Sequence, residues 1–517
     1  MPQFSVPDIN SLLKLLALSI TLKYIHRLYY RTKYWPPGPR GLPVLGNIFQ
    51  LPSFPWFAFT KWKAQYGPVI SLNLAGQPMV ILNTPKAASD LLVHRSHIYS
   101  DRPKFIMASE ILSGGLNFSL ISYADPWRRM RRATHEGFNV RAVEKYRSLQ
   151  EVEAARLAIN LLHSPNNWDL HFKRSAASTV LCGVYGWNPV GFNGDAIVER
   201  ANDMAHRLVR ATYPCAYLVE IFPLMKYLPS WMAKWKREGL EWFAKDLKMF
   251  EGLLSDVRER ELTGNCPPCF ALSVLENQSK NNLSTEETAW LAGMMFIAGS
   301  ETTAAALYVF LLAMVLNPDV MRKAQAEIDE VVGRDRLPTF RDFDTLPYIQ
   351  AMVKEVLRWR TVAPLSVPRC ASESDWYEGH YIPQGSLVVS NICCCFRDPD
   401  IFPDPDEFRP SRFLDTSGKV IHKFSDSMPL GHATYGFGKR ICSGLNMANQ
   451  SLFINIACML WALNIEKARD SHGNPIVPSS VDCVDEGIIV RPALFTCKIE
   501  PRSDDVVMML EQAKLEK

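Results

Sequence analysis

The sequence predicts a mainly α-helical fold with a smaller β region. Residues 284–316 form one long apolar stretch with helix signals at both ends, and helical patterns dominate from residue 84 onward. The strand-like runs are short and bounded by turn residues; they are Val69–Leu74, 79–82 and 387–395. A chain of 517 residues, 47% of them hydrophobic, can bury a large core around such elements.

The long stretch at 284–316 is predicted to be a core helix. Ser284 and Glu287 have the spacing of a capping box, and Asn317 followed by proline stops the helix. At about 1.5 Å per residue this helix crosses a whole domain. A second transmembrane span is the alternative, but Glu301 and neighbouring hydroxyl groups interrupt the apolar surface at its middle.

That interruption, Ala-Gly-Ser-Glu-Thr-Thr at 298–303, is a candidate functional site. A buried acid such as Glu301 is costly unless it has partners or a task. The hydroxyl of Thr302 is expected to donate to the carbonyl of Ala298, which would loosen the helix and open a notch for water or a ligand. Gly299 would remove side-chain bulk at this notch. The alternative is a set of helix hydroxyls satisfied by the backbone.

A cysteine loop at 435–444 reads Tyr-Gly-Phe-Gly-Lys-Arg-Ile-Cys-Ser-Gly. The basic residues before Cys442 and the apolar helical run after it favour the thiolate form of the cysteine. Gly438 and Gly444 would let backbone approach a flat group where a β-carbon would collide. The loop therefore predicts a thiolate presented to a planar iron cofactor. A lone buried cysteine beside a turn is the alternative.

Trp127 and Arg131 are four residues apart on a helical pattern and so share one face. An indole and a guanidinium on one face could clamp a buried carboxylate. A solvated basic face is the usual alternative for such a cluster.

Glu355 and Arg358 lie on another predicted helix, at 348–360, and are followed by a turn-rich segment at 404–413. Their spacing alone has little specificity, because Glu144 and Arg147 repeat it, as do pairs at 153/156 and 466/469. Most such pairs are exposed salt bridges of small value.

Composition excludes several functions. The net charge of +4 gives no general case for a nucleic-acid partner. The chain has no glycine-rich dinucleotide fingerprint and no phosphate-binding loop, so bound NAD or ATP is not expected.

The twelve cysteines are scattered, which fits a reducing, cytosol-facing compartment. Cys266 and Cys269 lack the second pair that a zinc site needs, and the three cysteines at 393–395 are predicted to lie in a buried strand.

The N-terminal residues 1–33 are predicted to be a membrane anchor. An apolar run at 9–30 is barely long enough to span a bilayer, and the basic residues that follow it would keep the downstream chain cytosolic. An amphipathic helix on the membrane surface is the alternative. Residues 34–48 are predicted to form a proline-rich spacer, and residues 49–517 a single domain.

In order along the chain, these motifs resemble those of the cytochrome P450 family. The family's cysteine-loop pattern, Phe-x-x-Gly-x-Arg-x-Cys-x-Gly, matches 435–444, except that Tyr435 replaces phenylalanine. Ser443 also stands where many members have proline. The family's proton-delivery pattern matches 298–303, and its Glu-x-x-Arg matches Glu355 and Arg358, with Arg412 as a third member of that network. The chain is similar to microsomal members, and to fungal enzymes of specialised metabolism in particular.

The resemblance implies a fold with a long central helix over a haem and the cysteine loop beneath it. Cys442 would be the ligand of the iron in haem b. The haem carboxylates would be held by Trp127, Arg131, Arg369 and Arg440. Thr302, with Glu301, would steer protons during oxygen activation, so the enzyme would insert one oxygen atom from O2 into its substrate. Glu355, Arg358 and Arg412 would hold the fold together on the cysteine side.

The same resemblance implies the partners. Electrons would come from a membrane-bound NADPH–haemoprotein reductase that docks near the cysteine loop, against Lys439 and exposed arginines among 128, 129 and 132. The catalytic domain would face the cytosol from the endoplasmic reticulum membrane. Segments expected to line the pocket, 105–121, 213–228 and 363–367, are largely apolar, so the sequence favours an apolar substrate such as a terpenoid or an aromatic polyketide.

Two other functions remain open at this stage. One is a haem-thiolate isomerase or dehydratase, and the other is a non-catalytic haem-binding protein. Both could dispense with the acid–hydroxyl pair, so the presence of Glu301 and Thr302 favours the monooxygenase.

Overall fold

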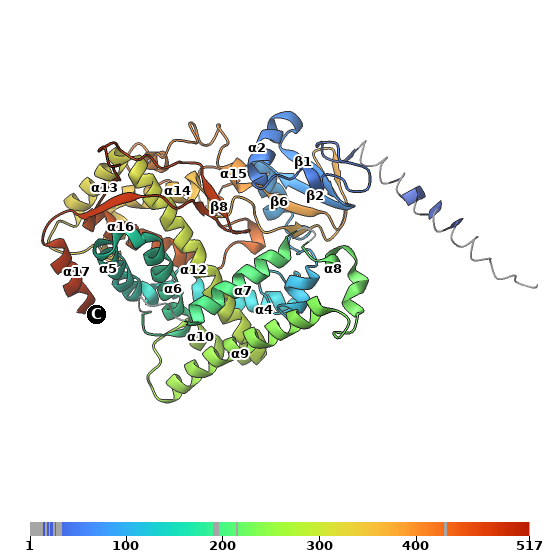
Figure 1. The fold of residues 1–517 in the computed structure, drawn as a ribbon, viewed down its shortest axis with the longest axis horizontal. Helices are drawn as coiled ribbons and strands as arrows, with labels where there is room; N and C mark the ends of the chain where they lie inside the picture. The colour runs from blue at the N-terminus through green and yellow to red at the C-terminus, as the bar shows by residue number, and fades with distance from the viewer. Residues whose placement is uncertain are drawn as a thin grey trace, which may run out of the picture.

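Helices surround one long central helix, and a small sheet lies at one end of the molecule (Figure 1). The computed structural model describes residues 14–15, 18–19, 21–23, 26, 34–189, 196–213, 216–428 and 432–515. Most of the predicted anchor, residues 1–33, therefore lies outside the described residues. The longer helices are α2 (Pro55–Tyr66), α4 (Asp125–Phe138), α5 (Arg147–His163), α6 (Trp168–Tyr185), α7 (Ala196–Thr212), α9 (Lys234–Leu262), α12 (Thr285–Leu316), α13 (Pro318–Val331), α14 (Pro347–Trp359), α16 (Leu445–Ala462) and α17 (Val506–Leu515).

Short helices and helical turns connect these elements. They are η1 (Ile48–Gln50), α3 (Pro85–Ser89), η2 (Asp90–His94), η3 (Ile106–Ile111), η4 (Ala142–Tyr146), η5 (Pro165–Asn167), α8 (Leu218–Ile221), η6 (Pro223–Tyr227), α10 (Phe270–Glu276), α11 (Gln278–Asn281), η7 (Phe340–Thr345), α15 (Ile392–Cys395), η8 (Pro410–Phe413) and η9 (Gly438–Arg440). The strands are β1 (Val69–Leu74), β2 (Gln77–Leu82), β3 (Arg369–Cys370), β4 (Asp375–Tyr377), β5 (His380–Ile382), β6 (Leu387–Ser390), β7 (Leu463–Lys467), β8 (Cys483–Asp485), β9 (Val490–Pro492) and β10 (Cys497–Pro501).

The largest sheet has the strand order β1-β2-β6-β3. β1 and β2 form an antiparallel hairpin that turns at Ala75 and Gly76, both with positive φ (48° and 94°). β2 pairs with β6 in parallel, so a long stretch of chain separates these neighbours. The first predicted strand is confirmed at Val69–Leu74, and the second begins two residues earlier than predicted, at Gln77.

The predicted strand at 387–395 is wrong in its second half. β6 ends at Ser390, and the three cysteines lie in the short helix α15. The side chain of Asn391 accepts a hydrogen bond from the backbone N–H of Cys394 at 3.2 Å, which caps a helical turn instead of extending the strand. The cysteines are buried as expected. A short apolar run is compatible with both a buried strand and a buried helix, so the sequence pattern could not distinguish between them.

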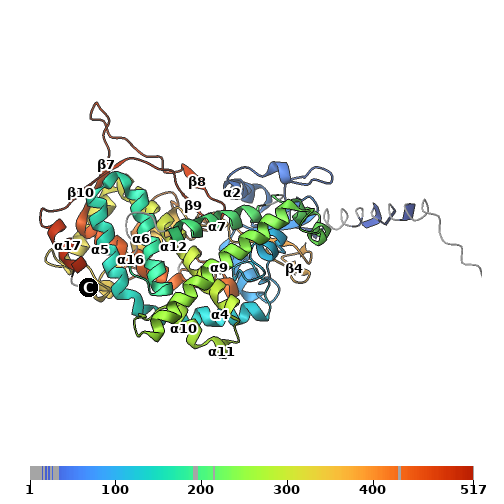
Figure 2. The same ribbon diagram turned by 60° about the horizontal axis from the view of Figure 1, so that its bottom comes forward.

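α12 is the core helix that the sequence predicts. It begins with the capping box of Ser284 and Glu287 and ends before Asn317. Within the described residues it is the one helix long and apolar enough to cross a membrane, but 78% of its most apolar window is buried inside the fold. It contacts α6, α9, α16 and β9, and α5, α6 and α16 pack side by side at the end opposite the sheet (Figure 1 and Figure 2).

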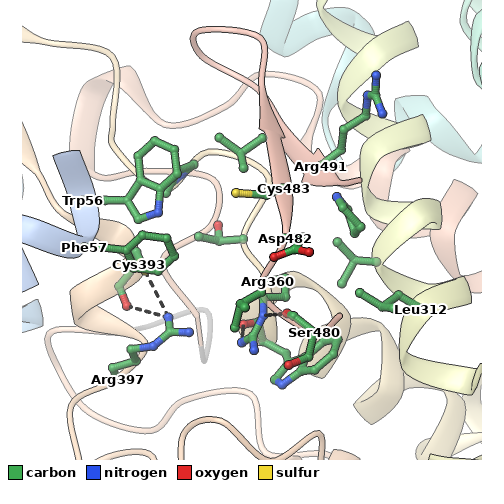
Figure 3. A pocket seen from close by; sticks show the side chains of 17 residues that line it. Trp56, Phe57, Leu312, Arg360, Cys393, Arg397, Ser480, Asp482, Cys483 and Arg491 are labelled. Atoms are coloured by element: carbon green, nitrogen blue, oxygen red, sulfur yellow. Dashed lines mark hydrogen bonds between the residues drawn. The ribbon is translucent and has the colours of Figure 1, made fainter. Parts of the chain in front are cut away.

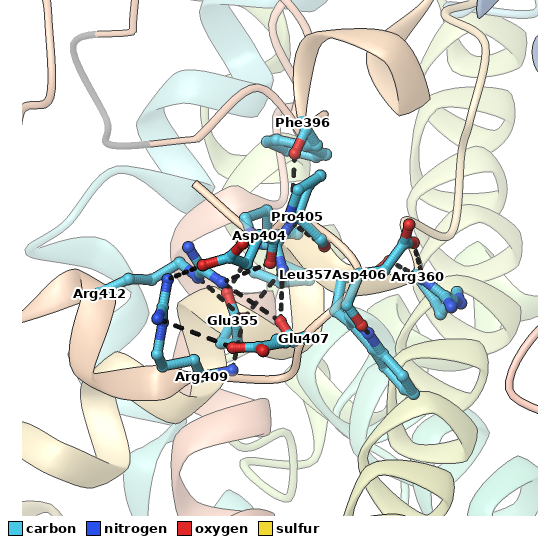
Figure 4. A network of polar contacts seen from close by, with 12 residues as sticks. Glu355, Leu357, Arg360, Phe396, Asp404, Pro405, Asp406, Glu407, Arg409 and Arg412 are labelled. Atoms are coloured by element: carbon cyan, nitrogen blue, oxygen red, sulfur yellow. Dashed lines mark hydrogen bonds and ion pairs between the residues drawn. The ribbon is translucent and has the colours of Figure 1, made fainter. Parts of the chain in front are cut away.

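A buried ionic network joins α14 to the turn-rich segment that follows β6 (Figure 4). Glu355 is 0% exposed and Arg358 is 1% exposed. One carboxylate oxygen of Glu355 accepts from Arg358 Nε at 2.6 Å, and the other accepts from Arg358 Nη2 at 2.9 Å and from Arg412 Nε at 3.1 Å. The backbone N–H of Arg409 donates to the same carboxylate at 2.7 Å. The structure therefore brings Glu355, Arg358 and Arg412 together.

The other Glu-x-x-Arg pairs differ in burial. Glu144 and Arg147 form an exposed contact of 3.6 Å, as predicted for an ordinary surface pair. Glu153 is instead fully buried and pairs with Arg156 at 3.4 Å and with Arg174 at 3.0 Å. Spacing alone did not distinguish these environments.

Candidate active site

The cysteine loop turns sharply before it enters α16. The backbone N–H of Cys442 donates to the carbonyl of Tyr435 at 2.9 Å, and Gly436 and Gly438 have positive φ (76° and 56°). A β-carbon on Gly438 would lie 2.1 Å from the carbonyl oxygen of Leu92, so this glycine permits close packing against η2, not the approach of a flat ligand. A β-carbon on Gly444 would meet open space.

The thiol of Cys442 lies at the N-terminus of α16. Burial raises its pKa, whereas the backbone N–H groups of Gly444 and Leu445 and the charge of Arg131 lower it. Many protein atoms surround the loop, yet the side chain of Cys442 keeps exposed surface. The donors around the sulfur would support a thiolate ligand.

Trp127 and Arg131 lie on α4, as predicted, and both reach the cysteine loop. Arg131 Nη1 donates to the carbonyl of Ile441 at 2.8 Å and to Ser443 Oγ at 2.6 Å. Trp127 is buried, and the guanidinium of Arg440 lies 4.4 Å from the centre of its ring. The structure thus places this pair directly beside the loop that carries the cysteine.

Three guanidinium groups next to the loop form no ion pair among the described residues, although Asp101 acts on two of them from a greater distance. They belong to Arg102, Arg369 and Arg440, and their side chains donate to backbone carbonyls, including those of residues 92, 99, 100, 119, 121, 367, 368 and 437. Burial lowers the pKa of each of them to about 9.

Burying several cations without an anion is costly. Arg440 Nη1 is also buried without a hydrogen-bond partner in the described part of the chain. This region therefore fits the acid groups of a ligand. Sequence reasoning found Arg369 and Arg440 but missed Arg102, because no motif surrounds it and its partners come from distant parts of the chain.

The middle of α12 is open, whereas the turns that follow it are buried. Ala298 is exposed and Glu301 and Thr302 are half-buried, whereas Ser300 and Thr303 are buried. Thr302 Oγ1 donates to the carbonyl of Ala298 at 2.8 Å, as predicted.

The predicted role of Gly299 is wrong. A β-carbon on Gly299 would lie 2.9 Å from Val180 on α6, so the glycine serves the close packing of two helices and not the notch. The pattern could not reveal this, because the partner helix lies more than a hundred residues earlier in the chain.

Glu301 faces charged groups from several elements. Burial raises its pKa; His206 on α7, Lys173 on α6 and Arg491 on β9 lower it, and Glu486 raises it further. No hydrogen bond joins its carboxylate to another of the described residues. A carboxyl group with a raised pKa binds a proton more readily than an exposed carboxyl group does.

Two of the three apolar segments predicted to line the pocket are joined by an acid that the sequence did not reveal. Glu220 on α8 accepts from the backbone N–H of Ile106 at 3.1 Å and from that of Met107 at 2.7 Å. Lys226 and Glu110 pair across the same boundary at 3.2 Å. These contacts hold α8 and the following turn against η3. Sequence reasoning missed Glu220 because its partners are backbone groups.

A separate cavity lies away from the cysteine loop (Figure 3). It has a volume of about 60 Å³ and is bounded by Trp56 and Phe57 on α2, Leu312 on α12, Cys393, and Cys483 on β8. Of the residues predicted to line the substrate pocket, Pro364 borders it. This volume holds a few water molecules at about 10–15 Å³ each. It is too small for a metabolite.

An exposed cysteine at the N-terminus of a helix, beside buried guanidinium groups that form no ion pair among the described residues, is an arrangement that suits a haem-thiolate protein. The family model for cytochrome P450 matches residues 36–492. The chain is 55% identical to cytochrome P450 monooxygenase 58 of Postia placenta, over 97% of this chain and 95% of that protein. It is 44% identical to a cytochrome P450 monooxygenase of Armillaria gallica, over 97% and 96%. The chain therefore belongs to the cytochrome P450 family, a family of haem-containing oxidoreductases that use O2 and a redox partner.

The fold agrees with this membership. A solved zebrafish cytochrome P450 structure with abiraterone matches with a TM-score of 0.67 at 22% identity, over 87% of this chain and all of that chain. The predicted fold class is confirmed. The residues at the site also fit the haem that the family implies. The exposed thiol of Cys442 supplies a soft iron ligand, and Arg440 Nη1, which has no hydrogen-bond partner among the described residues, supplies a donor for a carboxylate.

Proposed function

We propose that this protein is a monooxygenase that inserts one oxygen atom into an apolar small molecule of specialised metabolism. The observation that carries the proposal is the pair of Glu301 and Thr302 at the opened middle of α12. An isomerase or dehydratase of the same class, or a haem-binding protein without catalysis, would not need a proton-donating pair there. The fungal relatives at 44–55% identity are named as monooxygenases, which supports the same choice.

The proposed roles follow from the contacts. Cys442 would ligate the iron of haem b, and acid groups of the haem would be held by Arg102, Trp127, Arg131, Arg369 and Arg440. When bound, a haem with a thiolate ligand supplies the cleavage of the O–O bond. Glu301 takes up a proton from solvent, since it faces exposed His206 and Lys173. Thr302 relays that proton inward: its hydroxyl oxygen accepts a proton while its own hydrogen, released from the carbonyl of Ala298, is donated to a new acceptor.

The substrate is proposed to be apolar, such as a terpenoid or an aromatic polyketide. Ile106, Met107 and Phe118 are buried, and Leu365 and Val367 are half-buried. These side chains offer apolar surface, with few polar groups that could recognise a sugar or a nucleotide.

A membrane location at the endoplasmic reticulum, with the catalytic domain in the cytosol, is proposed as well. Exposed apolar side chains gather around α8 and the turns that follow it, where Leu224 is 81% exposed and Trp231 is 75% exposed. Large exposed apolar patches mark contacts with membranes or partners. The apolar N-terminal run in the sequence supports the same location.

The proposed function is tested by product analysis. The full chain, reconstituted with an NADPH–haemoprotein reductase, is supplied with a fungal metabolite extract under ¹⁸O2. We expect NADPH-dependent products that contain one ¹⁸O atom. Conversion of a hydroperoxide without NADPH would instead establish the isomerase or dehydratase, and haem binding without any turnover would establish the non-catalytic protein.

Thr302→Ala is expected to uncouple turnover. Without the hydroxyl, protons reach the site less selectively, so product formed per NADPH falls by about tenfold and peroxide release rises. Thr288→Ala is the matched control, because Thr288 makes the same type of bond, to the carbonyl of Ser284 at 2.9 Å, far from the opened middle of α12. If Thr302→Ala and Thr288→Ala formed the same amount of product per NADPH, another group would deliver the protons.

The reductase is proposed to dock on exposed basic residues beside the cysteine loop. Arg128 and Lys439 are exposed and both lie over the ring of Tyr123, at 5.7 and 4.8 Å from its centre. Arg132 is exposed too. Arg129 does not belong to this surface, because it is half-buried and pairs with Glu287 at 2.8 Å.

Reversing this charge in the double variant Arg128→Glu/Lys439→Glu is expected to lower reductase-supported kcat/KM by about tenfold and to weaken its dependence on salt. Turnover driven by added peroxide, which needs no reductase, should stay near the wild-type rate. Lys498→Glu on β10 is the control for an exposed charge elsewhere. An unchanged salt dependence would place the docking surface on another face.

A further inference from the structure

Ser443 departs from the family pattern directly after Cys442, and the structure gives its hydroxyl a partner. Arg131 Nη1 donates to Ser443 Oγ at 2.6 Å and to the carbonyl of Ile441 at 2.8 Å. One nitrogen of a side chain on α4 therefore contacts the residues on both sides of the cysteine.

The direction of this hydrogen bond is fixed by chemistry. A guanidinium has donors only, so Ser443 Oγ must accept. Alanine offers no acceptor at this position, and proline, which many family members have here, offers none either. The contact with Ile441 uses a backbone carbonyl, which any residue would supply. Ser443 thus adds a side-chain contact to Arg131 that the usual family sequence lacks.

The rest of the guanidinium is available for a ligand. Arg131 Nε and Nη2 make no hydrogen bond to other residues that the structure describes, and they are not among its fully buried orphan atoms. A guanidinium is planar and rigid, so fixing one of its nitrogens also fixes the directions of its remaining N–H donors. Arg102, Arg369 and Arg440 lie around the same loop, and none of them forms an ion pair in the described part of the chain.

Tyr435, the other departure from the family pattern, points elsewhere. Its hydroxyl donates to Asn449 Oδ1 on α16 at 2.8 Å. It fastens the start of the loop to α16 and makes no contact with Arg131 among the described residues. Tyr435 interacts with the thiol only electrostatically, so Ser443 is the departure that contacts Arg131.

We infer that Ser443 is a positioning residue that holds Arg131 against the cysteine loop and directs its free N–H groups toward an acid group of the haem. The inference rests on the proposed function, because it assumes that haem binds at Cys442. Ser443 does not touch the reacting atoms. It acts through Arg131.

The test measures haem retention in the full-length holoenzyme. The variants are Ser443→Ala, Ser443→Thr, Arg131→Met and the double variant Ser443→Ala/Arg131→Met. Each is mixed with excess apomyoglobin, and the rate of haem transfer is followed by absorbance. We expect Ser443→Ala to release haem about tenfold faster than wild type, since a hydrogen bond to a charged group is lost. Ser443→Thr keeps an acceptor and should stay within about twofold of wild type.

The double variant separates positioning from a general loss of structure. If Ser443 acts through Arg131, the double variant releases haem no faster than Arg131→Met alone. Additive effects of the two substitutions, or a Ser443→Ala rate equal to wild type, would overturn the inference. The far-UV circular dichroism spectrum of the Ser443→Ala holoenzyme should match that of wild type, which shows that the effect concerns the ligand and not the fold.

This experiment gives different results if the proposed function is wrong and if only the role of Ser443 is wrong. Wild-type protein that never acquires a haem-thiolate absorbance band contradicts the proposed function. If the wild-type protein has the band but Ser443→Ala transfers haem at the wild-type rate, only the role of Ser443 is contradicted.

Discussion

Replacing Glu355 by glutamine is expected to lower the free energy of unfolding by about 3–5 kcal/mol, because it leaves buried arginines without a counter-charge. The carboxylate is 0% exposed and accepts from Arg358, from Arg412 and from the backbone N–H of Arg409. Glutamine keeps the volume of the side chain, so the loss reports on charge and hydrogen bonding and not on a cavity. Urea unfolding of the holoprotein measures it.

Glu144→Gln is the matched control for that experiment. It removes the carboxylate of another Glu-x-x-Arg pair on the same chain, but this pair with Arg147 is exposed and 3.6 Å long. The expected loss is below about 1 kcal/mol. Equal losses in the two variants would show that burial of the network around Glu355 (Figure 4) contributes nothing particular to stability.

Replacing Cys442 by alanine is expected to abolish the thiolate-type Soret band of the reduced, carbon monoxide-bound protein, together with oxygenase activity. Among the described residues, Cys442 is the cysteine that combines an exposed side chain with N–H donors from the start of α16. Residual haem held by the arginines alone would show a different band. The absorbance spectrum and the haem content per chain measure the outcome.

Cys266→Ser is the control for a cysteine outside the loop. Cys266 lies between α9 and α10 and is only partly exposed. This variant should keep the band and the activity. If the Cys442→Ala protein kept the thiolate-type band, the iron ligand would be another residue, and the site proposed here would be wrong.

Sequence patterns predicted the parts of the site whose signal is local. The capping box at Ser284 and the proline after Asn317 define α12 at its two ends. The bond from Thr302 to Ala298 follows from their separation of one helical turn. The cysteine loop carries its own glycines and basic residues, so it was found without knowledge of the fold.

The parts that the sequence did not predict depend on contacts between distant segments. Gly299 faces Val180, and Gly438 faces the carbonyl of Leu92, so the reason for each glycine lies on another element. Arg102 and Glu220 bind backbone groups, which leave no residue pattern. Cys393 to Cys395 were assigned to a strand because apolar composition does not distinguish a buried strand from a short buried helix.

The central claim is that Cys442 presents a thiolate to haem iron beneath α12. The most direct test is the difference spectrum of the purified full chain, reduced with dithionite, before and after addition of carbon monoxide. We predict the red-shifted Soret band of a thiolate-ligated haem, present in wild-type protein and in Cys266→Ser. A band at the position typical of histidine-ligated haem, or no haem-dependent band, would contradict the claim.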